Sequence, residues 1–397
     1  EPNLRVPQDR VPPTPERIAQ HCAASGDAVA AVDWWLMAGT RGLARSANVE
    51  VTEYMSRALH LLESLDSTPD IQARELSVQT MLGAALTGTR GYAAPEVEAA
   101  FTRALTLARL SGEHPKIFQA ELGLWMFHVV RADFPRALER ADAMMALARA
   151  YDHRSYFVEA AFALGLTHFF MGAPRKALEY LEACVAKDGP DRDRSISQRG
   201  GQDAGVCALV YMGLSHWMLG DPESAVARAE DAVALARGIE HPYSLVYAQH
   251  FTSWLRLWMR QYREAEAMSD QVIRTSEEMG YFWVTLGSIV RGSVRVSDGR
   301  PEEGLELITT GLDYYRGAGA RLSETLQLAL RAEAYMALGS PEAGLTSVRE
   351  ALRAIEATNE RFWHSDLRRV EGLLLVGSDP AAAEEAMRGA VELASAQ

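Results

Sequence analysis

The sequence predicts an all-α fold, a superhelical solenoid of helical hairpins. Turn signals recur along most of the chain, at Phe134, Pro174, Pro222, Tyr262, Pro301, Pro341 and Pro380. The successive spacings are 40, 48, 40, 39, 40 and 39 residues. A fixed period near 40 residues is typical of arrays in which each unit is one pair of packed helices. No segment alternates apolar and polar residues in the way that a half-buried strand does.

Each unit is punctuated in the same way, as in the Gly-Asp-Pro turn that ends at Pro222. Glycine adopts the positive φ that ends a helix, and proline fits the first position of the next helix. After this turn come Ala225, Ala229, Ala232 and Ala236, which share one helical face. Small side chains on one face allow two helices to approach closely, so each turn predicts a tight hairpin.

A small residue also recurs seven positions before the turn glycine, as at Gly165, Gly213, Gly292 and Ala332. Together with the turn and the alanines, this pattern resembles the tetratricopeptide repeat, lengthened from about 34 to about 40 residues. The extra residues imply helices that are longer by roughly one turn per hairpin.

The chain divides into three regions in this interpretation. Residues 1–15 contain five prolines and predict an extended linker. Residues 16–88 predict irregular helical hairpins, the first of them punctuated at Gly26 and Asp27, and residues 89–397 predict the repeat array. The 48-residue spacing is explained by a loop insertion at 186–201. A chain that begins at Glu1 rather than Met is expected to be a piece of a longer protein.

Composition excludes several classes of function. The 397 residues carry a formal net charge of −13, which disfavours nucleic acid because phosphate binding needs clustered Lys and Arg. No apolar run of 18 residues is present, so we expect no membrane span. Cys22, Cys184 and Cys207 lie far apart, which favours small core residues in a reducing cytoplasm.

Catalytic motifs are absent from the sequence. It contains no GxxxxGK[ST] phosphate loop, no HExxH, no GxSxG and no Cys/His cluster at zinc spacing. Acidic pairs such as Glu302-Glu303 and Glu384-Glu385 follow helix-opening prolines, where carboxylates complement the helix dipole. We therefore predict a chain that is not an enzyme and holds no cofactor or metal.

A binding surface is expected on the first helix of each hairpin, which lines the concave groove in tetratricopeptide geometry. That register places nine residues in the groove: Phe162, Phe169, Phe170, Trp217, Met218, His250, Trp254, Leu257 and Trp258. Aromatic residues are common anchors of binding sites. The alternative is that these side chains simply pack between helices as core.

A second set recurs four residues before the turn glycine position and is called the basic stripe below: His128, His168, His216, Arg256 and Arg295. One prediction is a ladder of donors that faces an anionic ligand. The alternative is that each side chain bonds a neighbouring carboxylate or carbonyl. A shared metal ion is disfavoured because adjacent repeats stack roughly 10 Å apart, whereas His ligands lie near 2 Å from the ion.

Four short stretches carry a further resemblance: RSAN at 45–48, GYAAPEVE at 91–98, GQDAGV at 201–206 and ERFW at 360–363. Residues 16–397 resemble the C-terminal repeat region of large bacterial signal-transducing ATPases, which often carry a class III adenylate/guanylate cyclase domain. The repeat region of maltose-regulator-like transcription factors is comparable. Ala204 departs from that pattern, which often has proline there.

The resemblance implies a right-handed superhelix that acts as the regulatory arm of a longer protein, whose N-terminal ATPase or cyclase domains are absent here. We accordingly predict a non-catalytic, cytoplasmic domain that binds a protein, a peptide or a small-molecule ligand in its groove. The alternative function is a structural scaffold for homo-oligomers, with the aromatic surface as the self-association face.

Overall fold

The computed structural model describes residues 14–189, 191 and 201–397. Within these ranges every regular element is an α-helix and no strand is present, which confirms the predicted all-α class. The predicted linker, apart from residues 14 and 15, lies outside the described residues. So does most of the predicted insertion, residues 190 and 192–200.

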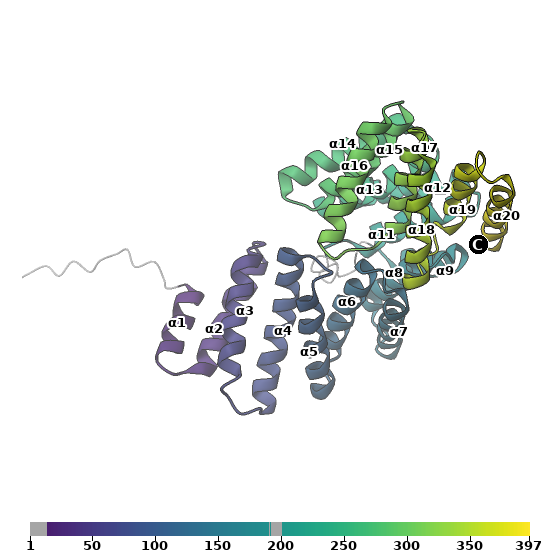
Figure 1. Cartoon of the computed structure of the whole chain (residues 1–397). Helices are drawn as coiled ribbons and strands as arrows, with labels where there is room; N and C mark the ends of the chain where they lie inside the picture. The colour runs from purple at the N-terminus through teal and green to yellow at the C-terminus, as the bar shows by residue number, and fades with distance from the viewer. Residues whose placement is uncertain (1–13, 190, 192–200) are drawn as a thin grey trace, which may run out of the picture. The chain divides into compact units, whose positions relative to one another are not determined.

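The helices follow one another along the chain as successive packed pairs (Figure 1). Their bounds are α1 Pro15–Ala24, α2 Ala28–Leu43, α3 Asn48–Leu62, α4 Pro69–Arg90, α5 Pro95–Ser111, α6 His114–Val130, α7 Phe134–Ala150, α8 Arg154–Phe170, α9 Pro174–Lys187, α11 Ala204–Met218, α12 Pro222–Gly238, α13 Pro242–Trp258, α14 Tyr262–Met279, α15 Trp283–Ser297, α16 Pro301–Gly317, α17 Glu324–Ala337, α18 Pro341–Thr358, α19 His364–Leu375 and α20 Pro380–Ala396. No helix in the described part of the chain is both long and apolar enough to cross a bilayer. The chain divides into two compact units, residues 1–123 and 124–397, with the division inside α6.

Unit 1, residues 1–123, contains the less regular helices. Gly26 adopts φ +84°, and the side chain of Asp27 accepts a hydrogen bond from the Ala30 amide at the start of α2. The predicted punctuation at these two residues is therefore present. The core of this unit is built around the buried indole of Trp35, which stacks on Tyr54 at a ring distance of 5.2 Å.

Unit 2, residues 124–397, contains the regular hairpins. All seven predicted turn residues are the first residue of the second helix of a hairpin, in α7, α9, α12, α14, α16, α18 and α20. Gly172, Gly220, Gly299 and Gly339 adopt positive φ in these turns, and Asp133, Asp221 and Asp379 cap the helices that follow. The turn chemistry predicted from the sequence is confirmed.

The two helices of each hairpin approach as closely as the small residues predict. A Cβ atom added at Gly213 would lie 2.9 Å from the carbonyl oxygen of Ala225. A Cβ added at Gly292 would lie 2.9 Å from the carbonyl oxygen of Gly304. Real Cβ atoms do not approach backbone oxygen this closely, so glycine is needed at both positions. The four predicted alanines of α12 are all buried.

The first helices of successive hairpins pack side by side in one row, in the order α8, α11, α13, α15, α17 and α19. Two later loops of the chain return to the C-terminal ends of earlier first helices. The amides of Arg321 and Leu322 donate to the carbonyl oxygen of Val130, at 2.8 and 3.1 Å. One period later, the amides of Arg361 and Phe362 donate to the carbonyl oxygen of Phe170, at 2.8 and 3.1 Å.

These two contacts have the same separation, since 130 and 321, like 170 and 361, are 191 residues apart. Unit 2 therefore turns back on itself after about five repeat units, and we call this pair of contacts the closure. The side of the first helices that the closure encloses is called the inner face. This face corresponds to the groove that the sequence predicts along the first helices.

Candidate ligand-binding surface on the inner helices

The inner face next to the closure is filled by a cluster of aromatic rings. Phe362 is 1% exposed and contacts Phe169, Phe170 and Trp254 at ring distances of 5.4, 5.0 and 6.5 Å. Tyr211 lies against Phe169 and Phe170, at 5.1 and 5.7 Å. The loop between α18 and α19 thus inserts its own aromatic side chain where an open groove was expected.

The prediction of groove exposure is consequently wrong for Phe162, Phe169 and Phe170, which are fully buried, at 2%, 0% and 0% exposure. Phe162 packs on Trp125 at 5.6 Å. The alternative interpretation, in which these residues are core, describes them. The physical reason is the closure, because a chain that turns back after about five repeat units leaves no open channel at this level.

The tryptophans of α13 lie between the core and the surface. Trp254 is 5% exposed and contacts His250 and Trp258 at ring distances of 5.4 and 6.0 Å. Trp258 is half-buried and packs on Trp363 at 4.7 Å. Trp217 and Met218, at the end of α11, are also half-buried.

Four members of the basic stripe bond acidic or amide groups of their own chain. In His128 and His216, Nδ1 lies 3.5 Å from a carboxylate oxygen of Asp133 and Asp221, the residues that cap the following helices. Arg256 donates to Gln261 at 2.7 Å and to Glu230 at 3.1 Å. Arg295 forms ion pairs with Glu266 and Asp298.

His168, the fifth member of the basic stripe, packs instead. Its ring stacks on Tyr180 at 5.6 Å, and burial together with nearby Lys176 lowers the pKa of His168 to about 4. Four members of the stripe therefore follow the alternative interpretation, in which the side chain bonds a neighbouring group of its own chain, and Arg256 and Arg295 reach the preceding hairpin for it. A ladder of free donors for an anion is not what these contacts describe.

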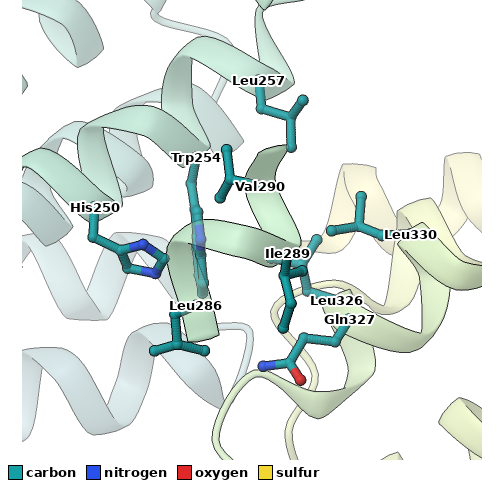
Figure 2. A pocket seen from close by; sticks show the side chains of 9 residues that line it. All are labelled: His250, Trp254, Leu257, Leu286, Ile289, Val290, Leu326, Gln327 and Leu330. Atoms are coloured by element: carbon teal, nitrogen blue, oxygen red, sulfur yellow. The ribbon is translucent and has the colours of Figure 1, made fainter. Parts of the chain in front are cut away.

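A small cavity remains on the inner face, between α13, α15 and α17 (Figure 2). It is lined by His250, Trp254, Leu257, Leu286, Ile289, Val290, Leu326, Gln327 and Leu330. The first three were predicted groove residues. The centre of a water molecule can move through only about 10 Å³ of this space, which is room for about one ordered water.

The two polar side chains of the cavity have no hydrogen-bond partner among the residues that the structure describes. His250 is 1% exposed, and neither of its ring nitrogens is bonded. Gln327 is 2% exposed, and both its amide nitrogen and its amide oxygen are unbonded. Burial lowers the pKa of His250 to about 3, so its ring is neutral near pH 7. Buried polar groups in proteins are nearly always bonded. Ser215, Thr252 and Trp283 also lack a partner among the described residues, but His250 and Gln327 each leave two polar atoms unbonded and line the same cavity.

Gln327 was missed by the sequence interpretation, although the repeat contains a signal for it. Fourteen positions before the start of the second helix, the five preceding units carry Ala120, Ala160, Ala208, Ala248 and Gly287, which are all small and buried. Gln327 occupies this position in the next unit, and the half-buried Asp366 occupies it in the last. A buried amide in a column of alanines is the feature that an alignment of the repeats reveals.

Within the described ranges, no group of three His, Cys, Asp or Glu side chains could hold a metal ion. No disulfide joins the three cysteines, all of which lie in the described ranges, and Cys184 and Cys207 are buried. Burial raises the pKa of the Cys207 thiol well above its usual value, so this thiol is not poised for reaction.

No family model matches the chain. An uncharacterised protein of Rhizobium meliloti (strain 1021) is 23% identical over 393 residues, which cover 96% of this chain. The match spans 37% of that relative, so the chain corresponds to about a third of its length.

Solved structures share the fold at low sequence identity. A Rap protein in complex with competence and sporulation factor has a TM-score of 0.65 at 11% identity, covering 92% of this chain and 97% of that one. The Rap conjugation gene regulator of plasmid pLS20, in complex with a Phr peptide, has a TM-score of 0.54 at 12% identity, covering 92% and 95%. The chain therefore has the tetratricopeptide-like helical repeat fold, as predicted.

Proposed function

We propose that this chain is a non-catalytic, ligand-sensing repeat domain that binds a peptide on its inner face. One observation carries the proposal: three successive first helices, α13, α15 and α17, converge on a single apolar cavity that holds two unbonded polar side chains. An apolar pocket with a few convergent polar groups is the usual form of a ligand site. The row of first helices is elongated, which suits an extended segment better than a compact small molecule.

The similar folds support a peptide as the ligand. The Rap protein was solved with competence and sporulation factor, and the conjugation regulator with a Phr peptide. The absence of charged side chains among the residues that line the cavity agrees with a ligand bound through neutral and apolar groups. It also weighs against the small anionic ligands that the basic stripe had suggested.

The predicted residues take different parts in this proposal. His250 and Trp254 line the cavity and form the ligand-facing wall, and Trp258 packs on Trp254 beside it. Phe169 supports Trp254 through Phe362. Phe162 lies against Trp125 and Tyr211, and Trp217 is half-buried at the end of α11, so neither lines the cavity. The basic stripe, His128, His168, His216, Arg256 and Arg295, braces the hairpin turns behind it.

The domain would act as the regulatory arm of a longer signalling protein. Its resemblance to the repeat region of signal-transducing ATPases and cyclases supports this, and so does the greater length of the rhizobial relative. In that arrangement peptide binding on the inner face changes the hairpin angles, and the adjoining catalytic domains respond to the change.

The proposal is tested by offering the full 397-residue chain a pool of random hexapeptides with blocked termini. Retained peptides are recovered by size exclusion and identified by mass spectrometry, and their affinities are measured by calorimetry. Leu330→Phe should weaken binding by at least about tenfold, because the larger ring fills the cavity. Leu219→Phe, at a half-buried position after α11, is the matched control and should bind normally. A wild-type chain that retains no peptide contradicts the proposal.

A second candidate function, a scaffold for homo-oligomers, is favoured by one observation. The last hairpin leaves Leu373, Val376 and Val391 at 39%, 58% and 66% exposure. Exposed apolar side chains of this kind are typical of association surfaces. Sedimentation analysis over a range of concentrations separates the two candidates, because only the scaffold predicts a mass that rises with concentration.

A further inference from the structure

We infer that His250 and Gln327 form a clasp for one peptide bond of an extended ligand, with the apolar wall of the cavity receiving the neighbouring side chain. The inference rests on the proposed function, since it specifies how the same inner face recognises a peptide. Both residues project into the cavity from different helices, His250 from α13 and Gln327 from α17 (Figure 2).

The clasp follows from an imbalance in hydrogen bonding. Four polar atoms, both ring nitrogens of His250 and both terminal atoms of Gln327, are buried and unbonded in the part of the chain that the structure describes. Leaving such groups unpaired destabilises a protein, so they are retained for a partner that comes from elsewhere. The partner has to reach a cavity whose other seven lining residues are Trp, Leu, Ile and Val.

The chemistry of the two side chains selects a neutral amide. A glutamine offers one acceptor and two donors, and a neutral imidazole offers one of each. A peptide bond presents one N–H and one C=O, so it can donate to one of these acceptors and accept from one of these donors. A carboxylate or an ammonium group in this apolar cavity would lack a counter-charge and would lose its hydration, so charged ligand groups are disfavoured.

An ordered water is the simpler occupant, and the geometry limits what it can do. The cavity holds about one water, and a buried water makes about three hydrogen bonds. A water that makes three hydrogen bonds leaves one of the four polar atoms unbonded. A peptide enters only by displacing the Leu and Ile side chains that narrow the space, and the experiment below separates the two occupants.

The test uses Gln327→Leu and His250→Leu in the full chain, with the hexapeptides selected above as probes. Each substitution should weaken binding by about tenfold, the value of one good hydrogen bond of about 1.4 kcal/mol. Each should leave the thermal midpoint unchanged or raised, because an apolar side chain replaces an unbonded polar one. Thr252→Val is the matched control: its buried hydroxyl is also unbonded among the described residues, but it does not line the cavity, so binding should not change.

A series of N-methylated probe peptides locates the peptide bond. Methylation at one position should weaken binding to the wild-type chain and have no further effect on Gln327→Leu. Equal affinity for wild type, Gln327→Leu and His250→Leu would mean that the cavity holds water only, and the clasp would be rejected. If Leu330→Phe still blocked the peptide in that case, the proposed function would stand without the clasp. Failure of the wild-type chain to bind any peptide would reject both.

Discussion

Two buried polar side chains of unit 2 invite comparison, Glu360 and Gln327, which are 1% and 2% exposed. The carboxylate of Glu360 accepts from the Ser323 amide at 2.7 Å and from the Thr325 amide and hydroxyl at 3.0 and 2.6 Å. Gln327, on the helix that Glu360 caps, has no partner among the described residues. The difference shows that burial alone does not identify a candidate functional residue, and Gln327 is distinguished by lacking a partner while it lines a cavity.

The contrast has a structural origin. Glu360 belongs to the loop that forms the closure, where it satisfies the free amides at the start of α17. Gln327 lies one turn further along α17, on the side that faces the cavity. The start of α17 is thus held by Glu360, whose hydrogen bonds are all made within the chain. One turn later the same helix carries Gln327, whose amide bonds no other described residue.

The largest effect is expected from Glu360→Leu. It removes an acceptor from two backbone amides and a hydroxyl, and orphaned buried donors cost about 1–3 kcal/mol each. We expect a loss of about 3 kcal/mol in the free energy of unfolding, measured by urea denaturation. Gln327→Leu, the matched variant in the helix that Glu360 caps, should not lower the free energy of unfolding. Equal losses of unfolding free energy for the two variants would contradict the view that Glu360 is bonded within the chain and Gln327 is not.

An effect of intermediate size is expected in the pH dependence of the free energy of unfolding, through the second unbonded side chain of the cavity, His250. The pKa of His250 in the folded chain, about 3, lies below the ordinary histidine value of 6.5, so the unfolded chain binds a proton first as the pH falls. The stability contribution of a neutral His250 is therefore complete above about pH 6.5. It is lost at about 1.4 kcal/mol per pH unit as the pH falls toward 3.

The measurement is the urea-unfolding free energy of wild type and His250→Leu at pH 7.5 and 5.5. Glu360 acts in the opposite direction, because burial raises its pKa to about 7 and its contribution falls as the pH rises from about 4.5 to 7. Comparing the two chains cancels that contribution. Wild type should lose about 1.4 kcal/mol more than the variant on acidification. Parallel pH profiles would count against a buried neutral histidine.

The smallest effect is expected in the basic stripe. Arg256→Met removes a half-buried guanidinium that bonds Gln261 and an exposed Glu230, and such pairs contribute about 0–1 kcal/mol. Thermal unfolding should show a shift of a few degrees at most, and peptide affinity should be unchanged. A strong loss of binding in Arg256→Met would return the stripe to the ligand site and weaken the case for His250 and Gln327.

Local features of this fold were predictable from the sequence, and long-range ones were not. The turns at Pro174, Pro222 and the five other positions follow from glycine, proline and a fixed period, all of which act within a few residues. The closure depends on small rotations that accumulate over 191 residues, and no short pattern encodes them. For this reason the sequence placed Phe169 and Phe170 in a groove that the returning chain fills.

The candidate site was predictable in part. The register of the repeat identified His250, Trp254 and Leu257, which do line the cavity. Gln327 required a comparison of equivalent positions in the units, where the five preceding units carry Ala or Gly. Whether a buried polar group is bonded depends on the packing of three helices, so the free state of His250 and Gln327 was beyond any reading of residue type.

The repetition of the closure, at Val130 and again at Phe170, has a mechanical meaning. An open row of hairpins has free ends, so a change of angle at one interface moves everything beyond it. Here two later loops are hydrogen-bonded to the ends of earlier helices, so the row of hairpins forms a closed circuit. A rotation at one helix–helix interface of this circuit must be offset by rotations at the others. A ligand wedged between α13 and α15 or α17 therefore acts on the whole circuit at once.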